Sequence, residues 1–160
     1  MKRLRNENPD LDIVDLKILR ILAEDARTSV AEIARSVGMS APSVSERIRR
    51  LQDNGTIQAY TIRIDPAAFG LPLSAWLRIR PVPGQLAKVA EILQTIGEIV
   101  SCDRVTGEDC FIARAQVRSI GDLEAVIDRI IPYAMTNTAI IQSSPVAPRS
   151  PLEAATRTKQ

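Results

Sequence analysis

The sequence of 160 residues contains no histidine, only two cysteines and 3% aromatic residues. Without histidine, the chain lacks the commonest metal ligand and the commonest general base. Cys102 and Cys110 lack a CxxC spacing, and two thiols fit a reducing compartment better than a disulfide framework. We therefore expect a cytoplasmic protein with no metal site, no cofactor and no catalytic residues.

Long apolar runs and a strong net charge are also missing. No stretch approaches the roughly 20 apolar residues of a membrane helix, and no apolar run follows the charged first residues, so we expect neither a membrane span nor a signal peptide. The net charge is +2, with 11 basic and 10 acidic residues up to Asp65, then 10 basic and 9 acidic residues. A surface that binds a polyanion must therefore depend on where the charges lie.

What the chain does contain is aliphatic side chains in ordinary proportion. Hydrophobic residues make up 45% of the sequence, which is enough for one core or two small ones. Because aromatic residues are so few, the core must be aliphatic. Small aliphatic domains often gain stability by forming oligomers.

The first part of the chain, residues 1–65, begins with two predicted helices. Apolar residues spaced by three and four predict an amphipathic helix over residues 11–25. Ser29 and Glu32 have the spacing of a capping box at the start of a second helix. Gly38 ends that helix at a position suited to left-handed backbone geometry.

A third helix follows directly. Ser40 is its predicted cap, and Val44, Ile48 and Leu51 form its inward face. Residues 56–64 then predict a short β segment or hairpin. Helix, glycine-containing turn, helix and β segment together predict a winged helix-turn-helix, which binds double-stranded DNA.

After a linker over residues 66–72, the pattern changes to segments that predict a ferredoxin-like domain over residues 73–145. The predicted order is strand, helix, strand, strand, helix, strand. These segments are 73–80, 85–96, 99–105, 110–117, 120–131 and 136–143. The fold class is therefore α+β, and we expect the proline-containing tail, residues 146–160, to be extended or disordered.

The predicted sheet has two helices on one face, which leaves the other face uncovered. A second copy of the same sheet would cover it, so we expect a homodimer.

In a helix-turn-helix the second helix enters the major groove with its first residues at base edges. Burial of Val44, Ile48 and Leu51 leaves the rest of the third helix facing outward, with two further polar residues at the start of the preceding helix. The candidate DNA-binding residues are Thr28, Ser29, Ser40, Ala41, Pro42, Ser43, Ser45, Glu46, Arg47, Arg49 and Arg50.

These candidates have different predicted roles and different alternatives. Ala41 and Ser43 are small enough to approach bases, and Arg49 and Arg50 are placed to reach phosphates. Arginines near a helix end also complement the helix dipole as an ordinary solvated face. An alternative for Arg47 is an ion pair with a carboxylate of the first helix, and the alternative for Thr28 and Ser29 is simple capping.

Several motifs together resemble the leucine-responsive/asparagine-responsive regulator (Lrp/AsnC) family. The resemblance covers roughly residues 11–145. The matching stretches are Leu11-Asp12-x-x-Asp15-x-x-Ile18-Leu19, Arg27-Thr28-Ser29-Val30-Ala31-Glu32-Ile33-Ala34, Val37-Gly38-Met39-Ser40, Val44-x-x-Arg47-Ile48-x-x-Leu51, Gly55-x-Ile57-x-x-Tyr60, Val105-Thr106-Gly107 and Thr136-x-Thr138.

The resemblance implies a transcription factor that forms dimers and often octamers and that senses amino acids or related metabolites. In the family, effectors bind between subunits near the turn that corresponds to residues 106–110, and the last strand supplies further contacts. The candidate effector-binding residues are Arg104, Thr106, Gly107, Glu108, Asp109, Cys110, Thr136 and Thr138.

This turn departs from the family pattern in one respect. Several members have Gly-x-x-Asp, whereas here Cys110 holds the fourth position and Asp109 precedes it. The carboxylate that would hold an amino-acid ammonium group is thus displaced. An alternative is that Gly107 only supplies the positive φ of a hairpin, and that Cys110 is a small buried thiol.

Two other functions compete with a ligand-tuned regulator. An architectural protein would wrap DNA without an effector, although the modest charge argues against binding by bulk electrostatics. Sirohaem decarboxylases resemble this family, but their chemistry relies on histidine, which this chain lacks. We therefore expect a regulator and not an enzyme.

Overall fold

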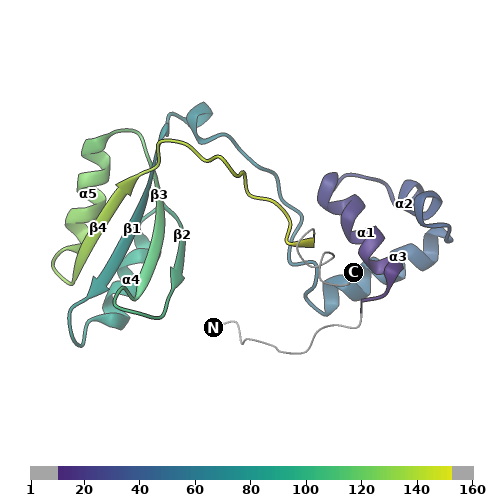
Figure 1. Ribbon diagram of the computed structural model, residues 1–160, viewed down its shortest axis with the longest axis horizontal. Coiled ribbons are helices and arrows are strands. Elements are labelled where there is room, and N and C mark those ends of the chain that lie inside the picture. Colours follow the sequence, from purple (N-terminus) through teal and green to yellow (C-terminus); the bar gives the residue numbers. More distant parts are fainter. Residues whose placement is uncertain (1–10, 153–160) are drawn as a thin grey trace. The chain divides into compact units, whose positions relative to one another are not determined.

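A computed structural model describes residues 11–152 of the chain (Figure 1). It divides into two compact units. One contains the residues up to Arg63 together with those from Pro148 onward, and the other spans Ile64–Ala147. The chain thus leaves the first unit, builds the second and returns to the first.

Three helices form the first unit: α1 (Ile13–Glu24), α2 (Val30–Val37) and α3 (Ala41–Asp53). The predicted ends of α2 and α3 are confirmed. Ser29 and Glu32 make the capping box of α2, Gly38 ends α2 with φ 71°, and the Ser40 side chain accepts a hydrogen bond from the backbone of Ser43.

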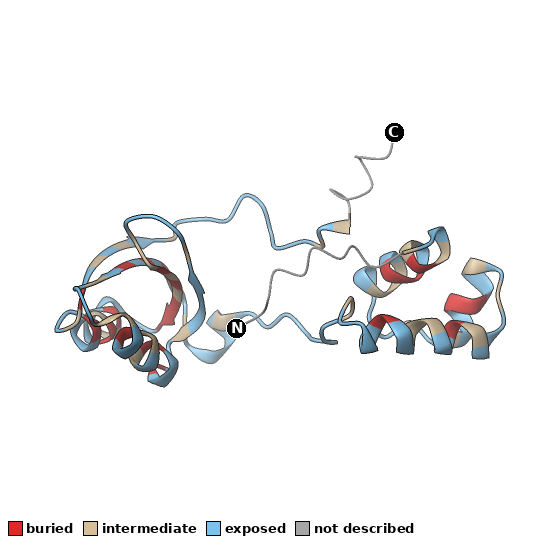
Figure 2. Ribbon diagram, turned by 90° about the horizontal axis from the view of Figure 1, so that it is seen from below, coloured by how far each residue is buried: buried red, intermediate tan, exposed pale blue. Residues whose placement is uncertain are grey.

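The core of this unit lies where the three helices meet (Figure 2). Its buried members come from all three helices and are aliphatic, as the composition predicts. They are Ile18, Leu19, Ile33, Ala34, Val44 and Leu51, with Ile48 partly buried against them. The helix-turn-helix prediction is therefore confirmed.

The β segment predicted after α3 is wrong. Residues 56–64 form no strand and pair with no other strand of the described chain. This segment has no glycine, asparagine or proline to reverse it into a hairpin, and a lone extended segment has no partner for its backbone groups. Tyr60, Ile62 and Ile64, which alternate along it, are exposed.

The second unit has the predicted βαββαβ order. Its elements are β1 (Leu73–Pro81), α4 (Leu86–Thr95), β2 (Ile99–Arg104), β3 (Phe111–Val117), α5 (Ile120–Ile130) and β4 (Ala134–Ile140). A short 3₁₀ helix, η1 (Pro66–Phe69), occupies most of the predicted linker. The strands form one antiparallel sheet in the order β2-β3-β1-β4, which is the ferredoxin-like arrangement.

Register decides which side chains share a face of this sheet. Leu77 lies opposite Ala113 and Thr138, and Leu77 is fully buried with residues of α4 and α5. Trp76, one residue earlier, lies opposite Arg114 and projects from the other face, where it remains 42% exposed. Both helices therefore cover one face and leave the other open.

The described part of the tail forms no helix or strand up to residue 150, and its end packs against the first unit. Leu152 packs against the helix-turn-helix core, where it lies with Leu19, Leu22 and Ile57 around a cavity of about 750 Å³. The Arg63 guanidinium also donates a hydrogen bond to the Pro148 carbonyl over 3.4 Å. Residues 148–152 thus belong to the first unit, and residues 153–160 lie outside the described chain.

Replacing Leu152 with alanine removes part of this packing and should loosen the first unit. Truncating a fully buried leucine costs about 2–5 kcal/mol, so for the half-buried Leu152 we expect about 1 kcal/mol. Hydrogen-exchange mass spectrometry should show faster exchange in α1 and unchanged exchange in β3. The exposed Val146→Ala is the matched control. Equal protection of α1 in Leu152→Ala and wild type would contradict the packing role.

Candidate nucleic-acid interface and ligand site

The first turn of α3 presents small side chains. Ala41, Pro42, Ser45 and Glu46 are exposed, and Ser43 is half-buried. The hydroxyl groups of Ser40 and Ser43 lie 2.8 Å apart and are hydrogen bonded to each other. A surface of this kind lets the helix backbone approach another molecule closely and still offers hydroxyl groups to it.

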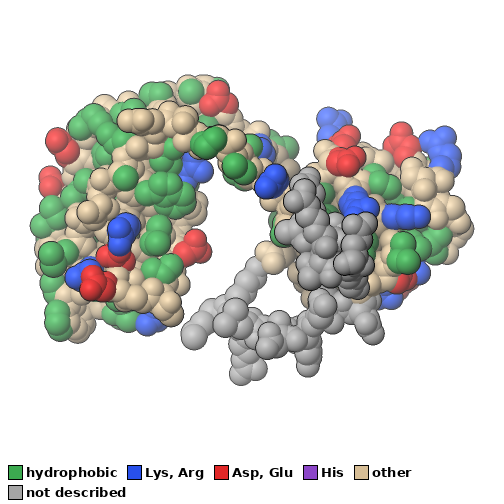
Figure 3. All heavy atoms as spheres, viewed as in Figure 1, with side chains coloured by type: hydrophobic (Ala, Val, Ile, Leu, Met, Phe, Trp, Pro, Cys, Tyr) green, Lys and Arg blue, Asp and Glu red, His purple; other side chains and the backbone are tan. Residues whose placement is uncertain are grey.

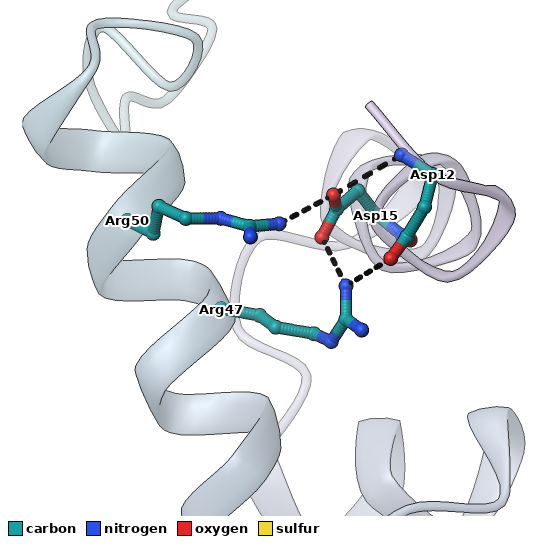
Figure 4. Close-up of polar contacts among 4 residues, drawn as sticks. All are labelled: Asp12, Asp15, Arg47 and Arg50. Carbon is teal, nitrogen blue, oxygen red and sulfur yellow. Dashed lines mark hydrogen bonds and ion pairs between the residues drawn. The ribbon is translucent and has the colours of Figure 1, made fainter. Parts of the chain in front are cut away.

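All three arginines of α3 form ion pairs with carboxylates. Arg49 pairs with Glu46 on the exposed side of the helix, with 2.8 Å between Nη2 and Oε2. Arg47 and Arg50 point the other way, toward Asp12 and Asp15 at the start of α1 (Figure 4). For Arg47, the structure therefore shows the alternative contact with carboxylates of the first helix.

Hydrogen bonds at this contact shift the pKa values of Asp12 and Arg47. The Asp15 backbone N–H and then the Arg47 guanidinium bind the Asp12 carboxylate, and together they hold the pKa of Asp12 below its ordinary value. Hydrogen bonds to Asp12 and Asp15 raise the pKa of Arg47. Both shifts favour the ionised forms that make the pair.

The two polar candidates before α2 are engaged in local hydrogen bonds. The Thr28 hydroxyl donates to the Asp25 carbonyl over 2.9 Å, and the Ser29 hydroxyl donates to Glu32 over 2.7 Å. Hydrogen bonds from the side chain and backbone of Ser29 lower the pKa of Glu32. Ser29 thus has the capping geometry that the sequence left as an alternative, whereas Thr28 closes the turn before it.

Two further cations lie beside these caps. The Arg27 side chain, just before α2, and the Arg35 side chain, in its last turn, have no ion-pair or hydrogen-bond partner in residues 11–152. Elsewhere on this unit, basic and acidic side chains are interspersed (Figure 3). The sequence already places Arg27 before the cap of α2, where an anion could bind, whereas sequence reasoning missed Arg35.

The turn between β2 and β3 carries the other group of candidates. Gly107 has φ 115°, a conformation that favours glycine. The Arg78 guanidinium binds the Asp109 carboxylate, with 2.6 Å between Nη2 and Oδ2, and Arg80 pairs with Glu108. These arginines are on the open face of β1, and sequence reasoning missed both because they lie far from the turn in the chain.

The remaining candidates of the second unit face elsewhere. Thr136 and Thr138 lie opposite Ile79 and Leu77, so they share the face that the helices cover. Arg104 lines a cavity of about 320 Å³ between α4 and β2. The half-buried Cys110 packs against the hydrophobic core. The structure therefore brings Glu108 and Asp109 together with arginines but places Thr136, Thr138 and Arg104 apart from them.

Comparison with known proteins identifies both units. Residues 11–52 match the AsnC-type helix-turn-helix domain, and residues 74–151 match the Lrp/AsnC ligand binding domain. The chain is 34% identical over 133 residues to the HTH-type transcriptional regulator LrpC of Bacillus subtilis, a match that covers 83% of this chain and 92% of LrpC. It is 37% identical over 132 residues to LrpA of Mycobacterium tuberculosis, covering 82% and 88% of the two chains.

Solved structures agree with the fold. The structure of Bacillus subtilis LrpC matches with a TM-score of 0.81 and 33% identity, covering 86% of this chain and 99% of that one. A feast or famine regulatory protein from Mycobacterium tuberculosis, complexed with L-methionine, matches with a TM-score of 0.81 and 35% identity, covering 88% and 97%.

The chain therefore belongs to the Lrp/AsnC family. It is a DNA-binding transcriptional regulator with a ligand-binding domain. The relatives are named as transcriptional regulators, which confirms the expectation of a regulator and not an enzyme. No helix within residues 11–152 is long and apolar enough to span a membrane.

Acid should destabilise the first unit through its two capping boxes. The pKa values of Asp12 and Glu32 in the folded protein lie below their ordinary 3.8 and 4.5. Each ionised carboxylate therefore stabilises the fold above its ordinary pKa, and this contribution is lost as the pH falls through the lower folded value. We expect the urea midpoint, followed by far-ultraviolet circular dichroism, to fall between about pH 5 and pH 3.

The matched variant for this experiment is Asp12→Asn combined with Glu32→Gln, which should flatten the pH dependence. Glu124→Gln, at an exposed position of α5, is the control and should leave the pH dependence as it is in wild type. The same acid dependence in wild type and the double variant would contradict the role of the caps.

Proposed function

We propose that the first turn of α3, residues 40–46, reads base edges in the major groove. The observation that supports this most directly is a small, exposed helix edge on a helix that is fixed to α1 by ion pairs. The Ala41 methyl group suits contact with a thymine methyl, and the Ser43 hydroxyl suits a base edge or a phosphate. Pro42, Ser45 and Glu46 border this edge.

Phosphate contacts then come from groups that are free to exchange partners. Arg49 pairs with Glu46 at the surface, where both side chains are mostly exposed, so a phosphate can replace the carboxylate at little cost. Arg27 and Arg35 add unpaired cations, and Thr28 and Ser29 lie at the N-terminus of α2, where the helix dipole favours an anion.

We propose that an amino acid binds near the turn over residues 106–110. An amino acid carries an ammonium group and a carboxylate, and the turn places the carboxylates Glu108 and Asp109 beside the guanidinium groups of Arg78 and Arg80. Asp109 would take the ammonium group that the family's aspartate takes. The related structure in complex with L-methionine supports this class of ligand.

We also propose that a second copy of the chain covers the open face of the sheet. Trp76 and Met135 are 42% and 68% exposed there, and large apolar side chains on an uncovered sheet face gain from burial against another sheet. Pairing two protomers in this way pairs two recognition helices, as binding to two half-sites requires. We further propose that these dimers assemble into higher oligomers and that the protein is cytoplasmic.

Enlarging Ala41 tests the reading surface. Ala41→Gln should push α3 away from the bases and weaken binding to the chain's own upstream DNA by about 5- to 100-fold, which corresponds to about 1–3 kcal/mol. Fluorescence anisotropy against that fragment and against random duplex measures the loss, which should fall on the specific fragment. Ala87→Gln, at an exposed position of α4, is the control. Equal affinity of Ala41→Gln and wild type would overturn the assignment.

A thermal-shift screen of the twenty amino acids tests the ligand site. A ligand that binds the folded state stabilises it by about 2.7 kcal/mol at 100 times its dissociation constant, so the melting temperature of wild type should rise with the right amino acid. Asp109→Asn should abolish that rise, and Asp128→Asn, on the exposed side of α5, should retain it. No rise with any amino acid, or an equal rise in Asp109→Asn, would count against the proposed site.

A further inference from the structure

Asp15 is the one charged side chain that is buried within residues 11–152, with no exposed surface. Removing a carboxylate from water is costly unless other groups compensate its charge and bind its oxygen atoms. The surroundings of Asp15 therefore matter more to the fold than those of a surface carboxylate.

Both oxygen atoms of Asp15 accept hydrogen bonds. Oδ1 accepts a hydrogen bond from Arg47 Nη1 over 2.9 Å, and Oδ2 accepts one from Arg50 Nη2 over 2.7 Å. Oδ2 also accepts a hydrogen bond from the backbone N–H of Asp12 over 3.3 Å. Two guanidinium groups of α3 thus bind one carboxylate of α1 (Figure 4).

Helix geometry explains why these residues meet. Asp15 lies in the first turn of α1, where the helix dipole stabilises negative charge. Arg47 and Arg50 are three residues apart, so they project from one face of α3. Arg47 also follows Ser43 by four residues and therefore lies one helical turn behind Ser43 on the same side of α3.

We propose that Asp15 is a positioning residue for DNA reading, and that Arg50 is its internal partner and not a phosphate contact. Two bonds from one carboxylate to two points on α3 fix the rotation of α3 about its own axis. That rotation decides which side chains of residues 40–46 face the bases. The inference rests on the proposed reading of DNA by α3.

The same contact explains why Arg50 differs from Arg49. If Arg50 moved to a phosphate, the buried carboxylate of Asp15 would lose one of its two guanidinium partners, whereas Arg49 leaves only the exposed Glu46 behind. Asp15 therefore keeps Arg50 from binding a DNA phosphate. The sequence alone does not distinguish Arg50 from Arg49 in this respect.

The salt dependence of binding to random-sequence duplex separates these roles. Each phosphate contact adds about 0.9 to the slope of log affinity against log salt. Arg50→Gln should leave the slope of the full-length protein unchanged, while the matched control Arg49→Gln should reduce it by about 0.9. A reduction of about 0.9 in Arg50→Gln as well would overturn the proposal, while leaving DNA reading by α3 intact.

Asp15→Asn provides the second test. It keeps the shape of the side chain but removes the ion-pair partner of Arg50 and leaves Arg47 with Asp12, so the slope for random duplex should steepen by about 0.9 or more. Preference for the specific fragment over random duplex should fall at the same time. Adding Arg50→Gln to Asp15→Asn should reverse part of the steepening. A merely structural role predicts weaker binding with no steeper slope, and that result, or retained preference in a folded Asp15→Asn, would overturn the assignment.

Discussion

The arrangement of the DNA-binding unit depends on a carboxylate that has no access to water. Asp15 is held at the start of α1 by the capping geometry of Asp12, and two guanidinium groups of α3 bind its carboxylate. The aliphatic core beneath it supplies most of the burial but little direction, because hydrophobic contact is not directional. The ion pairs of Arg47 and Arg50 with Asp15 define how α3 is rotated relative to α1.

Local signals made much of this fold predictable from sequence. The caps at Ser29 and Ser40 and the stop at Gly38 follow from backbone chemistry within a few residues. The order of strands and helices in the second unit follows from hydrophobic period in the same way. Residues 56–64 were the exception, because an alternating pattern predicts a strand only if a partner exists.

The functional surfaces were less predictable because they depend on contacts between distant parts of the chain. Nothing local distinguishes Arg50 from Arg49, and nothing near the turn announces that Arg78 will bind Asp109. The faces of Thr136 and Thr138 depend on the register of β4 against β1, which the sequence does not encode locally. The sequence suggested the pairing of Arg47 with the first helix, whereas the partners of Arg50 and Asp109 depend on the tertiary fold.

The return of residues 148–152 to the helix-turn-helix core has a consequence for how such a chain is built. The second unit is an insertion within the first, because the first unit contributes chain both before and after it. Its entry and exit lie side by side, since β1 and β4 pair and the Ile141 N–H donates to the Ser74 carbonyl over 2.8 Å. Adjacent ends are what modular exchange requires. A different sensor domain whose first and last strands are neighbours could therefore replace residues 64–147. The DNA-binding unit would keep both of its chain segments, the residues up to Arg63 and those from Pro148 onward.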